Sequence, residues 1–199
     1  MRYDQSDHWK VRLEVAKKIA SSRLHEMMRD KDHGVRCVVA KRIPVDRLPE
    51  MMKDLDFEVR RAVAKRIRPS RLHEMMEDPD WIVRCEVAKR IDPVRLPEMM
   101  RDPDWGTRCE VARRIDPALL PKMMSDHHWR IRQEVLERID PKYLSSMILR
   151  ESELVLILRI RALICENLEI RENYEPTGQE RSSLGKPPYP EGDSSVSGK

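Results

Sequence analysis

Apolar side chains recur along this chain with a period of 24 residues, and six copies of the unit align without a gap over residues 6–149. The first half of each copy spaces its apolar positions three or four residues apart, which is typical of a helix buried on one face. Strict repetition at this period predicts a solenoid, in which each unit packs mainly on its neighbours. An aromatic ring or a histidine recurs near the start of every unit, in the column Trp9, His33, Phe57, Trp81, Trp105 and Trp129.

The unit at residues 78–101 predicts one α-helix followed by one short 3-10 helix. Asp78 is a suitable N-cap and Pro79 a suitable first helical residue. The helix covers residues 81–91 and ends before Pro93, because the residue preceding a proline disfavours the α region. The remaining segment is too short for a stable α-helix, so we expect a 3-10 helix there. Nothing in the repeats alternates with period two, so the predicted fold class is all-α without a sheet.

The pattern D-P-D-W-x-V-R-x-E-V-A-x-R-I-x-P-x-x-L-P-x-M-M resembles the repeats of the leucine-rich repeat variant family over residues 6–149. The resemblance implies a right-handed superhelix of alternating α- and 3-10 helices. The founding member of that family carries a cysteine-ligated iron–sulfur module and comes from a nitrogen-fixing bacterium. An accessory role in nitrogen fixation or metallocluster assembly is therefore a hypothesis by resemblance. No cysteines cluster ahead of the first repeat, so we carry over no cluster and predict neither a metal site nor a cofactor.

The repeats, assigned to residues 1–149, are followed by two segments of different composition. Residues 150–174 contain a degenerate copy of the helix core, shifted by five residues, and predict a seventh unit or capping helix. The apolar run from Leu154 to Leu158 in this segment is expected either to pack on the sixth unit or to form a dimer contact. Residues 175–199 are rich in serine, glycine and proline, which predicts a disordered tail.

One arginine in every unit falls near the centre of the predicted apolar face. An unpaired charge there would be costly. Two columns of acids at the helix starts, represented by Asp30 and Asp32, can supply charge-assisted hydrogen bonds. We therefore predict a structural ladder between adjacent units, with ligand binding as the alternative. The column comprises Arg12, Arg36, Arg60, Arg84, Arg108 and Arg132.

A pair of basic residues near the end of each helix is predicted to lie on the solvated side. Glutamate precedes the second member by four residues and forms an i,i+4 ion pair, except where Val38 and Ala62 replace it. Net charge per unit falls from +3 through +2 and +1 to 0 in the last three units. The basic half predicts contact with an acidic protein or, as the alternative, with nucleic acid. The candidate contact residues are Lys41, Arg42, Lys65, Arg66, Lys89 and Arg90.

Three other groups of residues favour structural roles. The aromatic column is expected to pack in the core; if exposed, it would be a platform for bases or a partner helix. Cys37, Cys85 and Cys109 occupy one column of the repeat. Cys85 and Cys109, on neighbouring helices, are expected about 8–10 Å apart, which is too far for a disulfide or a shared zinc ion. His127 and His128 are predicted to cap a helix rather than to bind a metal.

These features predict a non-catalytic scaffold, not an enzyme, that binds a protein through one face of the solenoid. The sequence contains neither a phosphate-binding loop nor a nucleophile motif. It shows no signal peptide and no apolar run of membrane-spanning length. We expect a cytoplasmic location, with four free cysteines in a reducing compartment. The oligomeric state is expected to be a monomer or a dimer through the C-terminal cap.

Overall fold

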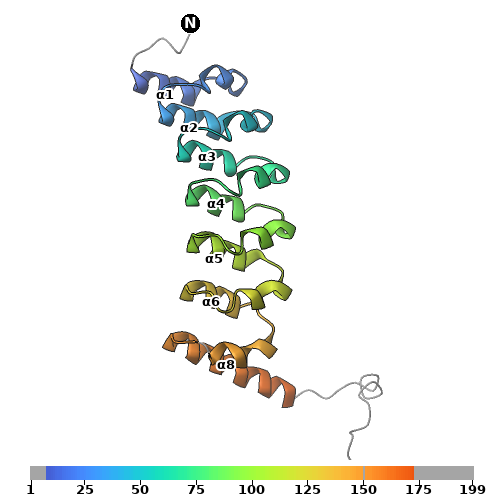
Figure 1. Cartoon of the computed structure of the whole chain (residues 1–199). Helices are drawn as coiled ribbons and strands as arrows, with labels where there is room; N and C mark the ends of the chain where they lie inside the picture. The colour runs from blue at the N-terminus through green and yellow to red at the C-terminus, as the bar shows by residue number, and fades with distance from the viewer. Residues whose placement is uncertain (1–7, 150, 173–199) are drawn as a thin grey trace, which may run out of the picture.

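The computed structural model describes residues 8–149 and 151–172, and every regular element in these ranges is a helix. α-Helices and 3-10 helices alternate, and the α-helices lie one above the next in a single column (Figure 1). The predicted all-α repeat fold is confirmed. The repeat α-helices are α1 (Trp9–Lys18), α2 (His33–Arg42), α3 (Phe57–Ala64), α4 (Trp81–Ala88), α5 (Trp105–Arg114) and α6 (Trp129–Leu136). The 3-10 helices are η2 (Ser21–Met27), η3 (Val45–Met51), η4 (Pro69–Met75), η5 (Pro93–Met99), η6 (Pro117–Lys122) and η7 (Pro141–Tyr143).

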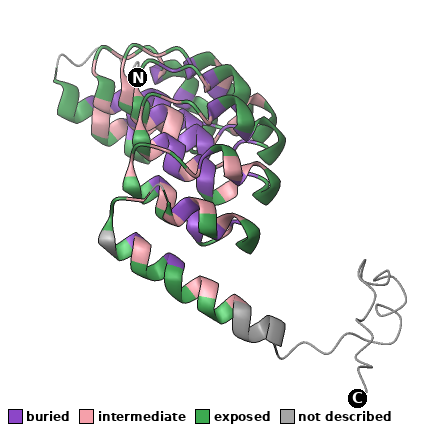
Figure 2. Ribbon diagram, turned by 60° about the horizontal axis from the view of Figure 1, so that its bottom comes forward, coloured by how far each residue is buried: buried purple, intermediate pink, exposed green. Residues whose placement is uncertain are grey.

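The core is a continuous band between the α-helices and the 3-10 helices (Figure 2). Within one unit, Val83, Val87, Ile91 and Leu96 are fully or almost fully buried. From α1 to α6, each α-helix packs on the next one, and α2, α3, α4 and α5 also pack on the 3-10 helix that precedes them. The apolar columns are therefore buried by contact between neighbouring units, as expected for a solenoid.

α4 begins at Trp81, as the sequence predicts, but it ends at Ala88 and its N-cap lies two residues later than predicted. The N-cap of α4 is Asp80, whose side chain accepts a hydrogen bond from the Ile82 backbone nitrogen, so Pro79 lies outside the helix. The prediction of Asp78 as N-cap is wrong, because its carboxylate accepts hydrogen bonds from an arginine of the preceding unit and from the Asp80 backbone. The same capping column supplies Asp32, Asp56 and Asp104.

The C-terminal end departs from the repeat. η7 continues directly into α7 (Leu144–Ile148), and α8 (Leu154–Glu172) is 19 residues long and packs on both. Leu156 and Ile160 of α8 are buried, whereas Val155 is 79% exposed and Leu158 is also exposed. Leu156 of the apolar run therefore packs in the core as expected, and a dimer contact through the exposed Val155 and Leu158 stays a prediction. The predicted disordered segment, 175–199, lies outside the described residues.

Within the ranges described, none of the helices combines the length and the apolar character that crossing a membrane requires.

Candidate interaction surface

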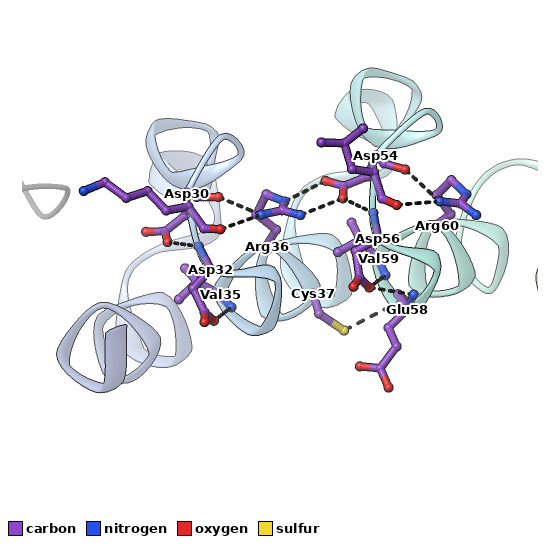
Figure 3. A network of polar contacts seen from close by, with 12 residues as sticks. Asp30, Asp32, Val35, Arg36, Cys37, Asp54, Asp56, Glu58, Val59 and Arg60 are labelled. Atoms are coloured by element: carbon purple, nitrogen blue, oxygen red, sulfur yellow. Dashed lines mark hydrogen bonds and ion pairs between the residues drawn. The ribbon is translucent and has the colours of Figure 1, made fainter. Parts of the chain in front are cut away.

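The arginine column forms a ladder of ion pairs that joins each unit to the next. The Nε and Nη2 atoms of Arg60 donate to the two carboxylate oxygens of Asp78 at 2.7 and 2.9 Å. Its Nη1 atom donates to the backbone oxygens of Asp54 and Leu55. Figure 3 shows the same arrangement one unit earlier, around Arg36. The pairs are Arg12–Asp30, Arg36–Asp54, Arg60–Asp78, Arg84–Asp102, Arg108–Asp126 and Arg132–Glu151.

Pairing keeps the ladder charged although it is nearly buried. Burial raises the pKa of Asp54, but hydrogen bonds from Arg36 and from the Asp56 backbone outweigh this effect, and the pKa lies below its usual value. Hydrogen bonding to Asp54 likewise raises the pKa of Arg36. Because both partners are satisfied within the fold, the ladder stabilises contacts between units.

The second member of each basic pair also has a structural role. Arg66 donates from Nη1 to the backbone oxygen of Ala40 at 2.7 Å. Arg90 donates to the oxygens of Ala64 and Ile67 at 2.6 and 3.0 Å. The last carbonyls of an α-helix have no partner within the helix, and a guanidinium of the next unit reaches them. Arg42, Arg114 and Arg138 contact the preceding unit in the same way.

The prediction that Arg42, Arg66 and Arg90 lie on the solvated side is therefore wrong. A helical wheel gives the direction of a side chain but not its reach, and the long arginine side chain turns back onto the neighbouring unit. The i,i+4 ion pair to glutamate is present for Lys18 and Glu14 at 3.8 Å. In the later units, the hydrogen bonds of the arginines to backbone carbonyls replace it.

The first member of each basic pair remains exposed. Lys65 and Lys89 lie 4.0 and 3.4 Å from the same carboxylate, that of Glu86, which also lies 3.6 Å from Arg61. Lys41 is exposed and makes no ion pair with any residue of the described ranges. Of the six candidate contact residues, the three lysines form an exposed basic column, which Lys17 and Arg113 extend.

The tryptophans of the aromatic column are exposed, so the prediction of core packing is wrong for them, whereas Phe57 is partly buried against the core. Trp81, Trp105 and Trp129 are 49%, 40% and 42% exposed. The rings of Trp81 and Trp105 each lie against the start of the next α-helix. The Trp105 ring stacks on His128, with centroids 4.4 Å apart, and a Cβ atom on Gly106 would lie 3.8 Å from Trp81. The remaining ring surface faces solvent.

The aromatic and lysine columns share one side of the α-helices. Trp81 and Lys89 stand eight residues apart, which is about 80° around a helix and about 12 Å along it. The Arg130 guanidinium lies 5.4 Å from the ring centroids of both Trp105 and Trp129, a cation–π geometry. We call this side, with the exposed aromatic and lysine columns, the aromatic–lysine surface. The sequence could have indicated this surface, because the angle between the two columns around the helix places both on the same side.

The cysteines and histidines take part in local structure. Cys37 and Cys109 are buried, and all four cysteines are free. Burial raises the pKa of Cys85 and Cys109, which disfavours the reactive thiolate. His128 caps α6, its Nδ1 atom accepting from the Arg130 backbone nitrogen. Among the described residues, no three potential ligands gather as a metal site would require.

The fold and its regular side-chain columns define an all-helical repeat solenoid. No family model and no curated protein sequence matches the chain. A solved structure described as "a leucine-rich repeat variant with a novel repetitive protein structural motif" is similar, with 33% identity and a TM-score of 0.76. The similarity covers 80% of this chain and 67% of that one. The chain belongs to the leucine-rich repeat variant family, as the sequence resemblance predicts.

Proposed function

We propose that this chain is a non-catalytic scaffold that binds a protein partner through the aromatic–lysine surface. The observation that carries the proposal is the row of half-exposed tryptophans, one on each of α4, α5 and α6. Large exposed rings aligned on one side of a repeat protein are typical of a binding surface. Tryptophan is also enriched among the residues that dominate interface energies.

The lysine column supports an acidic partner. Lys41 makes no ion pair with a described residue, and Val38 stands where four of the six units have glutamate. The charge excess of the first three units would steer an acidic surface toward this end. Arg42, Arg66 and Arg90 do not belong to this contact set, since their guanidinium groups cap the preceding helices.

We also propose that the chain has no catalytic activity and that it is located in the cytoplasm. Repeat architecture, with a long surface in place of an enclosed site, supports a binding role. Four free cysteines are in keeping with a reducing compartment.

Affinity capture from a native lysate, followed by mass spectrometry, tests the proposal. The informative variant changes Trp81, Trp105 and Trp129 to histidine, the residue that the second unit carries at this position as His33. A second variant changes Lys41, Lys65 and Lys89 to glutamate. We expect both variants to lose a protein that the wild type retains. Retention of that protein by both folded variants would contradict the proposal, and capture of nuclease-sensitive material alone would favour nucleic acid.

Light scattering of the purified chain determines whether Val155 and Leu158 hold two copies together, as proposed for a dimer through the C-terminal cap.

A further inference from the structure

A groove of about 700 Å³ lies between η2 and η3 and the turns that follow them. Its lining includes Met28 and Met51, together with Leu55, which is 96% exposed. The groove draws on different columns of the repeat from those of the aromatic–lysine surface. It combines apolar side chains with several charged groups.

The charges of this groove do not cancel. Each of its four acids has its own arginine: Glu26 pairs with Arg23, Asp30 with Arg12, Glu50 with Arg47 and Asp54 with Arg36. Three exposed cations remain that make no ion pair with a described residue, namely Arg29, Lys31 and Lys53. Lys53 lies near enough to Glu74 to help lower the pKa of that carboxyl, but Arg71 holds Glu74 directly and lowers its pKa most.

The chain contains its own control for this groove two units later. A groove of about 560 Å³ between η4 and η5 is lined by the equivalent positions. Its acids are paired in the same way, but Glu77 replaces Arg29, Pro79 replaces Lys31 and Pro103 replaces Leu55. Only Glu77 and Arg101 remain, and their charges balance. The excess of three positive charges is therefore a property of the first groove and not of the repeat.

We propose that the groove between η2 and η3 binds a short acidic peptide segment that also carries a large apolar side chain. Arg29 can hold a carboxylate with two parallel hydrogen bonds, and the two lysines add point charges. Leu55 and the adaptable, partly exposed Met28 supply the apolar contact. A nucleic-acid backbone would bring phosphates against Glu26 and Glu50 as well, whereas a short peptide confines its carboxylates to the three cations. This site is separate from the aromatic–lysine surface.

The test measures fluorescence anisotropy of a fluorescein-labelled peptide that alternates glutamate and leucine, titrated with the full chain at low salt. Changing Arg29, Lys31 and Lys53 together to glutamine should weaken binding by about tenfold or more, since each exposed pair contributes modestly. Arg101→Gln in the second groove is the matched control and should change affinity by less than about twofold. The same peptide with glutamine in place of glutamate should not bind.

A second variant, which moves the binding residues of the first groove into the second, tests the proposal even if the triple variant is less stable than the wild type. Glu77→Arg, Pro79→Lys and Pro103→Leu, added together to the triple variant, give the second groove the cations and the exposed leucine of the first and should restore binding. Unchanged peptide affinity in a folded triple variant would overturn the proposal. Tighter binding of a labelled oligonucleotide than of the peptide, lost in the triple variant, would also overturn it. The tryptophan-to-histidine variant should bind the peptide with unchanged affinity. A failure of the proposed function of the aromatic–lysine surface can therefore be told apart from a failure of the peptide site.

Discussion

The first α-helix and the interior α-helices carry the same apolar columns in different surroundings. Val11 of α1 is 52% exposed, whereas the equivalent Val35, Val59 and Val83 are completely buried. The difference arises because α1 has no described unit before it, while each interior helix is covered on both sides. Burial in this fold therefore depends on a pair of neighbouring units, and the sequence of one unit does not determine it.

The polar columns show the same contrast between interior and ends. α2, α3, α4 and α5 all begin at an aspartate N-cap, but histidine stands at that position in α1 and α6. The last step of the ladder uses Glu151 in place of aspartate. Because solenoid units are stabilised mainly by their neighbours, we expect the ends to open before the interior.

Acid should have the largest effect, because it acts on the ladder at several steps together. The pKa values of Asp54, Asp126 and Glu151 lie below their usual range. Their contribution to stability is therefore present above a pH of about 4 and is lost as the pH falls through the lower pKa values of the folded state. A circular-dichroism titration should show the loss of helix below pH 4, and unchanged stability down to pH 2 would contradict the ladder.

Breaking the ladder in the interior should cost more than breaking it at the end. Arg60→Ala leaves Asp78 buried without its guanidinium and should lower the free energy of unfolding by about 3–5 kcal/mol. Arg132→Ala should cost less, since the terminal unit can open locally. Chemical denaturation of both variants measures the difference. Equal losses would show that the ends are as cooperative as the interior.

The two members of a basic pair should differ in their effect on stability. Arg66→Met removes the hydrogen bond to the Ala40 carbonyl and should cost about 1–3 kcal/mol, because a donor to an otherwise orphaned carbonyl is lost. Lys65→Met, its neighbour, should stay within about 0.5 kcal/mol of the wild type. A larger loss for the lysine variant would reverse the assignment of structural and exposed roles.

Substitutions at the N-cap position of the α-helices should have the smallest effect on the free energy of unfolding. His128→Asp gives α6 the cap of the interior helices and should raise the free energy of unfolding by about 0.5–1 kcal/mol. Asp104→His in α5 should produce the opposite change. Thermal melts at neutral pH measure both. Destabilisation by His128→Asp would instead indicate that the stacking of His128 on Trp105 outweighs its capping role.

Much of the fold could be predicted from the sequence, because a strict period fixes both the elements and their neighbours. The sequence predicted a ladder between the arginine column and the acids at the helix starts, but it did not show that the Asp30 column pairs with arginine while the Asp32 column caps the helices. The directions of Arg66 and Trp81 could not be obtained from a helical wheel, since long side chains reach into the next unit. The basic groove was detectable as the replacement of Arg29 by Glu77 in one column, but only the structure shows which charges are already paired.

The central claim is that the tryptophans of the aromatic column form an exposed surface and are not part of the core. All four tryptophans of the chain stand in this column, so intrinsic fluorescence reports on it without mutation. Acrylamide quenching is the direct measurement. The structure predicts red-shifted emission and efficient quenching, both reduced when the captured partner protein is added. Blue-shifted emission that resists acrylamide in the free chain would place the rings in the core and contradict the proposed surface.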